Sequence, residues 1–397
     1  PDGNHLEESG GDGGMKWEKV KLGDIATFSN GINFNKTAYA KGIKLIGVSN
    51  FGDRFYPDYS QLQEVKKDIV RLEDCLRNGD IVFVRSNGNK ELVGRCMLVK
   101  NPTERVTYSG FCIRARLNDT DRYDPVYFTY YFKSKAFRRA VSGTAVGANI
   151  QNLSQARLSN HECRIPSIEV QHRIADILSA YDDLIENNQK QIKLLEEVAQ
   201  RLYKEWFVNL RFPGHENTKI VDGVPEEWRK FPLEEIAPVV TGKKDANYGD
   251  KGGNYPFFTC SQETITAPGY SFDTSAVILA GNGDFNVKLY RGKFEAYQRT
   301  YVLAPFDHSN LFNLYFTVQN NMEALAKGAS GSTIKFLTKG MLQKILVLTA
   351  DKKILDKFND YEENIQQKVE ALKKQVEDLT EIRNRLLPKL MSGEVEV

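Results

Sequence analysis

Paired cysteines, clustered histidines and long apolar segments are all missing from this chain of 397 residues. Its five cysteines are scattered, odd in number and without a Cys-x-x-Cys pair, and its five histidines show no metal-ligand spacing. This pattern argues against a zinc site or a disulfide framework and favours reduced thiols in a cytoplasmic protein. No apolar stretch approaches the roughly 20 residues that a membrane-spanning helix requires.

Signatures of two enzyme classes are also missing. There is no Gly-x-x-x-x-Gly-Lys-Ser/Thr loop, so no ATP-driven motor is predicted. A methyltransferase acting on exocyclic amino groups would need a loop such as Asn-Pro-Pro-Tyr, whereas Asn101-Pro102 is followed by Thr103. We therefore expect neither activity in this chain itself.

An internal repeat is the most informative feature that the sequence does have. Four segments return in the same order: Trp17–Ile25 as Trp228–Ile236, Asn87–Gly88 as Asn282–Gly283, Gly147–Ile150 as Gly331–Ile334, and Ile174–Ile185 as Ile354–Ile365. The offset between the copies falls along the chain, which indicates that the second copy has lost loop residues. We predict two mixed α/β globules, each followed by a long helix.

The repeat and the composition predict where the parts begin and end. Residues 1–14 are Gly-rich and acidic and precede Met15, so we expect them to be a cloning tag. The other predicted parts are a first globule (15–167), a central long helix (168–210), a Pro- and Gly-rich connector (211–227), a second globule (228–350), a distal long helix (351–393) and a tail (394–397).

Positive charge is confined to the two predicted globules, although the net charge is only +2. Residues 16–170 hold 25 basic and 16 acidic residues, and residues 228–350 hold 13 and 10. The helical stretches 171–227 and 351–397 carry more acidic than basic residues. This distribution is expected if both globules contact a polyanion and the helices do not.

Each globule repeats a strand that ends in a polar turn. Asp80–Arg85 precedes Ser86–Asn89, and Ser275–Ala280 precedes Gly281–Asp284. Further predicted elements are strands over Val93–Val99, Phe111–Leu117 and Glu295–Leu303 and a helix over Val126–Arg139.

A Gly-rich polar loop closes each globule, Gly143–Asn152 in the first and Gly328–Lys335 in the second. Glycine permits close approach of the backbone to a ligand, and the polar side chains suit phosphates or base edges. An ordinary turn is the alternative, but recurrence at the same place favours a shared task.

Apolar residues three and four apart predict a coiled-coil seam on both long helices. The expected seam consists of Ile174, Ile177, Tyr181, Leu184, Leu195, Val198 and Leu202 with the polar Asn188 and Gln191, and of Phe358, Tyr361, Ile365, Leu372, Val376, Leu379, Leu386 and Leu390. Helices of this length span roughly 50 Å.

One short pattern suggests a nuclease. Pro57-Asp58 and Glu64-Val65-Lys66 resemble the Pro-Asp…Glu-x-Lys arrangement, in which two carboxylates bind Mg²⁺ and a lysine helps to activate water. The gap of five residues is tight for two strands to present both acids together. Surface charges are therefore favoured, and a nuclease using Asp58, Glu64 and Lys66 stays as an alternative.

With the repeat, four phrases carry a resemblance to the specificity (S, HsdS-type) subunits of Type I restriction–modification systems. They are Ile165–Leu178, Leu202–Gly214, Val224–Trp228 and Leu386–Glu394. The second copy departs from the family pattern at one place. Where the first copy has a Pro-Ser…Gln-His-Arg stretch at the start of its long helix, the second has Thr349–Lys353, and we expect no change of function from this difference.

The resemblance implies an α+β protein with two target recognition domains and two long antiparallel helices that form a coiled coil. Each domain reads one half of a bipartite double-stranded DNA target, mainly in the major groove, and the helices set the spacer. The chain itself is not catalytic. Two methyltransferase subunits with S-adenosylmethionine dock on it, a restriction subunit with ATP and Mg²⁺ can join, and the docking candidates are Trp206, Phe207, Leu386 and Leu387.

Polar and basic loop residues are the candidates for DNA contact, because Arg and Asn pair bidentately with guanine and adenine. In the first globule they are Asn30, Lys36, Arg54, Arg85, Asn87, Asn89, Lys90, Thr144, Asn149 and Gln151. In the second they are Lys243, Lys244, Asn247, Tyr248, Asn282, Asn286, Lys288, Arg291, Ser332 and Lys335. A scaffold whose tandem globules bind proteins is the second alternative.

Overall fold

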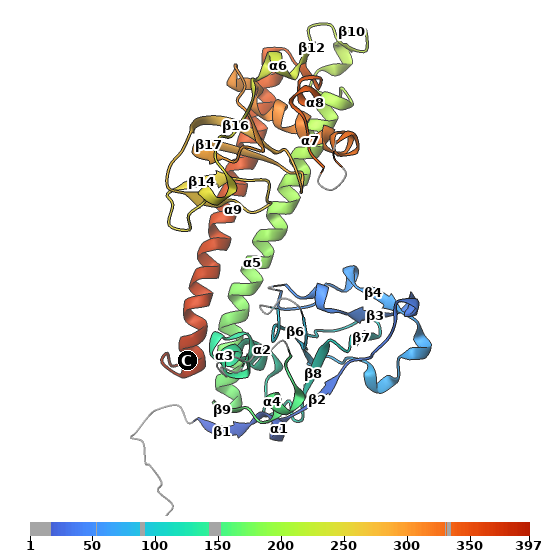
Figure 1. Ribbon diagram of the computed structural model, residues 1–397, viewed down its shortest axis with the longest axis vertical. Helices are drawn as coiled ribbons and strands as arrows, with labels where there is room; N and C mark the ends of the chain where they lie inside the picture. The colour runs from blue at the N-terminus through green and yellow to red at the C-terminus, as the bar shows by residue number, and fades with distance from the viewer. Residues whose placement is uncertain (1–16, 53, 88–91, 143–151, 330, 332–334) are drawn as a thin grey trace, which may run out of the picture. The chain divides into compact units, whose positions relative to one another are not determined.

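The computed structural model (Figure 1) describes residues 17–52, 54–87, 92–142, 152–329, 331 and 335–397. It divides into unit 1, residues 1–187 and 375–397, and unit 2, residues 188–374. The division falls within both long helices, α5 (Ile168–Tyr203) and α9 (Lys352–Ser392). No described helix is long and apolar enough to cross a membrane.

Unit 1 contains short strands in three small sheets. They are β1 (Glu18–Lys21), β2 (Ala26–Asn30), β3 (Tyr39–Ile46), β4 (Gln63–Val65), β5 (Ile81–Val84), β6 (Cys96–Leu98), β7 (Val106–Tyr108), β8 (Cys112–Leu117) and β9 (Glu162–Ile165). The sheet orders are β2-β8-β5-β6, β4-β3-β7 and β1-β9. Strand β5 is buried on both faces, since Ile81 and Phe83 join one apolar cluster and Val82 and Val84 join another.

The helices of unit 1 besides α5 are α1 (Leu22–Ile25), α2 (Pro125–Lys133), α3 (Lys135–Ser142) and α4 (Gln155–Ser159), with 3-10 turns at Lys36–Ala38, Val48–Asn50, Tyr59–Gln61, Lys67–Ile69 and Leu72–Asp74. The single helix predicted over Val126–Arg139 is wrong, because the chain breaks at Ser134. Ser134 has extended backbone (φ −62°, ψ 144°), and its hydroxyl accepts a hydrogen bond from the Phe137 amide at 3.2 Å.

Unit 2 contains a six-stranded sheet in the order β13-β18-β16-β17-β14-β15. Its strands are β13 (Val239–Thr241), β14 (Tyr255–Phe258), β15 (Ile265–Ala267), β16 (Phe272–Ala280), β17 (Val287–Ala296) and β18 (Thr300–Leu303). Two pairs lie outside it, β10 (Ile220–Val221) with β11 (Val224–Pro225) and β12 (Arg229–Pro232) with β19 (Leu346–Thr349). The predicted strand Glu295–Leu303 is interrupted by a turn at residues 297–299.

The helices of unit 2 besides α9 are α6 (Leu233–Ile236), α7 (Leu311–Gly328) and α8 (Lys339–Gln343). A π-helical turn, η6 (Lys204–Val208), continues α5, and 3-10 turns lie at His215–Asn217, Ala246–Tyr248 and His308–Asn310. Helix α9 begins after Asp351, whose carboxylate accepts from the Ile354 amide at 3.1 Å and from the Trp228 indole at 3.3 Å. Asp351 thus connects the start of α9 to the globule, although the segment Thr349–Lys353 differs from the corresponding segment of the first copy.

Strand pairing confirms the internal repeat, except that Asn282 corresponds to Ser86 and not to Asn87 as predicted. The orders β2-β8-β5 and β13-β18-β16 correspond, as do the pairs β1-β9 and β12-β19 and the parallel pairs β3-β7 and β14-β17. One difference explains why unit 2 has a single larger sheet. Strand β17 is continuous where unit 1 has β6 and β7, separated by a loop in which Asn101 adopts φ 43°.

On α5 the seam differs in phase from the prediction, whereas the predicted seam residues Phe358, Leu372 and Leu390 of α9 are buried. Leu184, Val198 and Tyr361 are 50%, 52% and 57% exposed. The buried positions include Ile174, Leu178, Ile185, Asn188, Ala199 and Tyr203 on α5, Trp206 on η6, and Leu355, Phe358, Glu362, Val369, Leu372 and Leu390 on α9. Adjacent apolar residues such as Leu184 and Ile185 make the phase ambiguous in the sequence, whereas the prediction that Asn188 lies on the seam is confirmed.

Within unit 2 the two helices run antiparallel. Glu196 of α5 pairs with Lys373 at 3.5 Å, and ten residues later, on η6, the ring of Trp206 lies 5.8 Å from that of Phe358. In unit 1, Arg383 of α9 pairs with Asp182 of α5, which also accepts a hydrogen bond from the Tyr130 hydroxyl at 2.5 Å. The charged pair and the Tyr130 bond attach both helices to the globule of unit 1.

Glu362 is a carboxylate in the apolar part of unit 2. Its side chain is fully buried, and neither oxygen accepts a hydrogen bond from any residue within the described ranges. Burial disfavours the charged form and raises the pKa of Glu362 to about 8. The next residue, Glu363, is half-buried and pairs with Arg291 at 2.8 Å, which lowers its pKa.

Phe358 is the first residue that we would test. It is fully buried among Tyr203, Trp206, Phe207 and Phe316. We expect Phe358→Ala to lower the free energy of unfolding by about 3–5 kcal/mol, because it leaves a cavity. The matched control Tyr361→Ala removes an exposed ring and should cost within about 1 kcal/mol. Urea unfolding followed by tryptophan fluorescence measures both, and equal losses would contradict the observed seam.

Glu362 predicts a stability that falls as pH rises. The folded chain keeps this proton up to about pH 8, whereas the unfolded chain loses it near the ordinary pKa of 4.5. Glu362→Gln should therefore stabilise unit 2 relative to the wild type, by up to about 1.4 kcal/mol for each pH unit between these pKa values. Urea unfolding at pH 5, 6.5 and 8 measures the difference.

Glu363→Gln is the matched control for that series. Its folded pKa is lowered, so the stability that it contributes is present at neutral pH and lost on acidification. The control should therefore destabilise the chain at pH 8 and approach the wild type at low pH. A pH-independent effect of Glu362→Gln would show that the buried carboxylate does not titrate as described.

Candidate nucleic-acid interface

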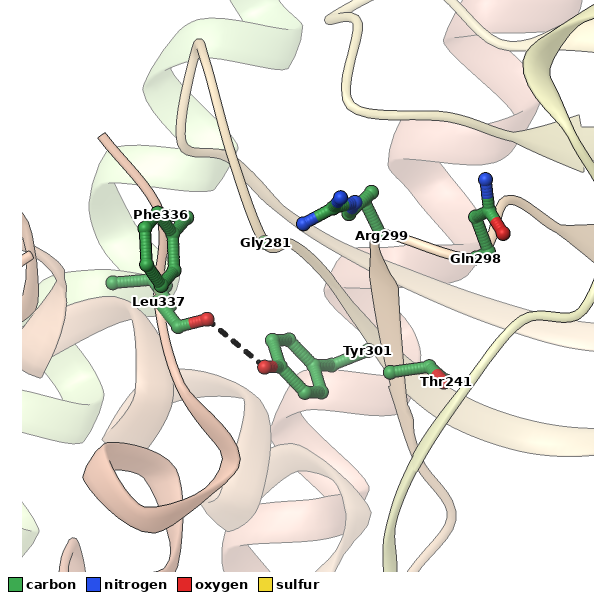
Figure 2. A pocket seen from close by; sticks show the side chains of 7 residues that line it. All are labelled: Thr241, Gly281, Gln298, Arg299, Tyr301, Phe336 and Leu337. Atoms are coloured by element: carbon green, nitrogen blue, oxygen red, sulfur yellow. Dashed lines mark hydrogen bonds between the residues drawn. The ribbon is translucent and has the colours of Figure 1, made fainter. Parts of the chain in front are cut away.

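A cavity of about 320 Å³ opens at one end of the strands β13, β16 and β18 in unit 2 (Figure 2). Its lining residues come from the end of β13, the segment after β16, the turn before β18, β18 itself and the segment before α8. They are Thr241, Gly281, Gln298, Arg299, Tyr301, Phe336 and Leu337. The second Gly-rich loop precedes Phe336, so this end of the sheet is where the predicted polar turns meet.

Main-chain hydrogen bonds hold the three segments together around Gly281. The Gly281 amide donates to the Arg299 carbonyl at 2.9 Å, and the Leu337 amide donates to the Gly281 carbonyl at 2.8 Å. A Cβ at position 281 would lie 2.3 Å from the Arg299 carbonyl oxygen, so this close approach requires glycine. The Tyr301 hydroxyl donates to the Leu337 carbonyl at 2.9 Å and secures the floor of the cavity (Figure 2).

One basic residue lines this cavity and two more lie on neighbouring segments. Arg299 is exposed, and no carboxylate of the described ranges contacts its guanidinium. The Lys244 and Lys335 main chains accept hydrogen bonds from the amides of Gln298 and Gly283, at 2.9 and 3.3 Å, which places both lysines beside the cavity walls. The Lys244 ammonium lies 4.4 Å from the centre of the Tyr248 ring. This grouping of cations, amides and an aromatic ring suits phosphates and base edges.

Unit 1 has the same arrangement at the corresponding strand ends. The Arg85 amide donates to the Phe111 carbonyl at 2.8 Å, and the Leu153 amide donates to the Arg85 carbonyl at 2.8 Å. Isolated bridges join Ser86 to Asn152 here and Asn282 to Phe336 in unit 2. The Arg85 guanidinium donates to the Gly110 carbonyl at 3.2 Å, and Phe111 is 63% exposed.

The structure brings some of the first globule's candidates to this place and not others. Asn30 ends β2 beside Ile113 of β8, and Arg85 and Asn87 follow β5. Lys36 is exposed on a 3-10 turn, and Arg54 pairs with Asp58 at 3.1 Å. Asn89, Lys90, Thr144, Asn149 and Gln151 lie outside the described residues, as does Ser332 of the second globule.

Candidates of the second globule divide in the same way. Lys243, Lys244, Asn282 and Lys335 lie in or beside the segments that line the cavity, whereas Tyr248 and the exposed Asn247 lie on the 3-10 turn Ala246–Tyr248. The side chains of Asn286 and Lys288 donate to the main chain of the Cys260–Ser261 loop, at 3.2 and 2.7 Å, and burial lowers the pKa of Lys288. Arg291 pairs with Glu363 and lies over the Phe312 ring, away from the cavity.

Sequence reasoning missed Arg299, Phe336 and Phe111. Arg299 lay inside a segment predicted as one strand, where a side chain of the turn was not expected. The signal that could have revealed Arg299 was the internal repeat, because Tyr297–Tyr301 in the second copy corresponds to Ser109–Ile113 in the first.

The geometry of the structure does not support the nuclease alternative. The Asp58 carboxylate accepts from Arg54 and from the Ser60 hydroxyl, and the latter bond is 2.6 Å long. The Glu64 carboxylate accepts from the Gly42 amide at 2.6 Å. Within the described part of the chain, no group of three His, Cys, Asp or Glu side chains is placed to hold a metal ion.

Two of the predicted docking residues are buried in unit 2. Trp206 and Phe207 are 6% and 5% exposed, and Phe207 packs between the rings of Trp228 and Phe358. Their side chains therefore form part of a core and offer no surface to a partner. Leu386 and Leu387 are partly buried against the apolar cluster of unit 1.

Comparison with known proteins agrees with this architecture. Residues 15–197 and 225–378 match the family described as Type I restriction modification DNA specificity domain. The specificity subunit of Type I restriction enzyme EcoDI from Escherichia coli is 37% identical over 176 residues, which cover 43% of this chain and 39% of that protein. The MjaIX specificity subunit of Methanocaldococcus jannaschii is 26% identical over 336 residues, 77% of this chain and 76% of that protein.

A likeness of fold extends over nearly the whole chain. The crystal structure of a Type I restriction–modification S subunit from M. genitalium superposes with a TM-score of 0.60 at 18% identity, and 98% of each chain is covered. The chain spans well under half the length of the E. coli relative. Since both matched segments together span most of its residues, the chain belongs to the family of Type I restriction–modification specificity subunits.

Proposed function

We propose that this chain is the DNA-recognition subunit of a Type I restriction–modification complex and that each unit reads one half of a bipartite target. The observation that carries this proposal is the repeated site. In both units three segments meet through matching main-chain hydrogen bonds, and each site has an arginine without a carboxylate partner among the described residues. Two equal sites in one chain suit two half-sites on one duplex.

The long helices supply the spacing in this proposal. Helices of 36 and 41 residues are each at least about 50 Å long, which is the scale of half-sites separated by one or more turns of DNA. Charge supports the same division of roles, since the helical stretches carry more acidic than basic residues. The length of the nonspecific gap then follows from the helices and not from base contacts.

Catalysis belongs to partner subunits in this proposal. Two methyltransferase subunits dock on the helices and bring S-adenosylmethionine, and a restriction subunit that joins them uses ATP and Mg²⁺. Leu194 and Val198 of α5 are 60% and 52% exposed in unit 2, and Ile382 of α9 is 46% exposed in unit 1. These exposed apolar side chains replace Trp206 and Phe207 as the docking candidates.

The proposal predicts a split methylation motif. When the chain is produced with its methyltransferase in a methylation-free host, single-molecule sequencing should show N6-methyladenine in a two-part motif with an unspecified gap. Exchange of residues 228–350 for the matching domain of another family member should change one half of the motif only. A stable, active complex that methylates no defined sequence would contradict the proposal.

Affinity for DNA should fall steeply with salt if the basic groups contact phosphates. For about four phosphate contacts, a rise from 50 to 200 mM salt should weaken binding of the methyltransferase complex roughly a hundredfold. Fluorescence anisotropy with a labelled duplex that contains the mapped motif measures this. A protein-binding scaffold predicts no salt-dependent DNA binding, so a flat salt response would favour the scaffold.

A further inference from the structure

The two repeated sites can be compared residue by residue through their main-chain hydrogen bonds. Arg85 and Gly281 are equivalent, since each donates to the turn before β8 or β18 and accepts from Leu153 or Leu337. By the same bonds Phe111 is equivalent to Arg299 and Asn152 to Phe336. Two more bonds support this register, from Cys112 to Ser109 and from Thr300 to Tyr297, both 2.8 Å.

The side chains have changed places while the backbone has not. Unit 1 carries an arginine at the strand end and a phenylalanine on the turn, Arg85 and Phe111. Unit 2 carries glycine at the strand end, an arginine on the turn and a phenylalanine on the third segment, Gly281, Arg299 and Phe336. Each site therefore keeps one arginine and one exposed phenylalanine, supplied from different segments.

Both guanidinium groups are directed to the same part of their sites. Arg85 starts at the strand end and reaches the Gly110 carbonyl, next to Phe111. Arg299 starts on the turn, and its guanidinium end points toward Gly281, on the side of the cavity that Phe336 lines (Figure 2).

Neither arginine is held by an acidic group. No carboxylate within the described residues contacts Arg85 or Arg299, whereas Arg291 of the same sheet is paired with Glu363. A guanidinium has five N–H donors in a planar fork and cannot be deprotonated in a protein. An arginine without an ion-pair partner at each of the repeated sites is suited to an acceptor that the ligand supplies.

We propose, on the basis of the function proposed above, that Arg299 reads a guanine in the second half-site and is the counterpart of Arg85 in the first. Guanine presents O6 and N7 to the major groove as two adjacent acceptors, which match the guanidinium fork. The neighbouring phenylalanine supplies an apolar wall that excludes water from this pair. Lys244 and Lys335, at the margins of the cavity, bind phosphates and fix the register.

Methylation mapping with Arg299→Ala and Arg85→Ala tests the assignment. Each variant is produced as a complex with the methyltransferase in a methylation-free host, and Arg229→Ala is the matched control. Arg229 is exposed on β12 and donates to the main chain of Glu226, outside the cavity lining. Arg299→Ala should relax one G·C position of the second half-site by roughly tenfold or more in preference, with the first half-site and the gap unchanged.

The other arms of the experiment have defined meanings. Arg85→Ala should relax one position of the first half-site, and Arg229→Ala should leave the motif as it is. An unchanged motif with Arg299→Ala, or equal loss of methylation at every site without any relaxation, would overturn the assignment of Arg299 to a base. The wild-type motif would still stand in both cases, so the proposed function would survive.

A measurement on the DNA covers the case in which Arg299→Ala does not fold. The wild-type complex is bound to duplexes in which 7-deazaguanine, which lacks N7, replaces guanine at one position at a time. One position of the second half-site should weaken binding tenfold or more in the wild type but much less in the Arg299→Lys complex, because lysine lacks the fork. Equal losses in both complexes at every position would exclude Arg299 as the reader.

Discussion

Main-chain pairing at the strand ends is the constraint on which both candidate sites depend. In unit 2 the carbonyl and the amide of Gly281 bind two separate segments, and Arg85 does the same in unit 1. The segment that leaves this junction forms α4 and β9 in unit 1 and α8 and β19 in unit 2, and then enters a long helix. Because β9 and β19 pair with β1 and β12, a shift at the junction would disturb the attachment of the helix to its globule.

Burial of the seam between the long helices is the second constraint, and this seam contains polar residues at a cost in stability. Asn188 and Glu362 occupy seam positions where apolar residues would be more stable. Glu362 is the extreme case, since its carboxylate accepts no hydrogen bond from the residues described. Beside it, Glu363 takes the ion pair with Arg291 and so holds the β-sheet of unit 2 to α9. Of these two adjacent residues, Glu362 lowers stability within the seam, and Glu363 attaches the sheet at its margin.

The sequence alone predicted the elements that depend on pattern. The internal repeat, the strand over Asp80–Arg85 and the polar seam residue Asn188 rest on repeated phrases and hydrophobic spacing, and the structure confirms them. Hydropathy did not give the phase of the seam, because Leu184 and Ile185 are equally apolar and only packing selects between them. It also did not exclude a carboxylate from burial at position 362.

The site residues were harder to predict for a different physical reason. Arg299 lies in a turn of three residues between two strands, and its importance comes from a backbone register that links it to Gly281 and Leu337. No residue in that turn is shared with the first copy, so comparison of side chains did not reveal the equivalence. Arg291 was selected as a basic loop residue, but it lies within β17 and its guanidinium pairs with Glu363.

A frame held by main-chain bonds allows the side chains that meet the ligand to change without loss of the fold. The same amide-to-carbonyl bonds form at position 85, which carries arginine, and at position 281, where the close approach to Arg299 requires glycine. An arginine can therefore move from the strand end to the turn, and a phenylalanine from the turn to the third segment, while the sheet order is kept. A pair of domains built in this way can differ in what each recognises and still share the long helices. The side chains supply recognition, whereas main-chain hydrogen bonds of the same three segments maintain the fold.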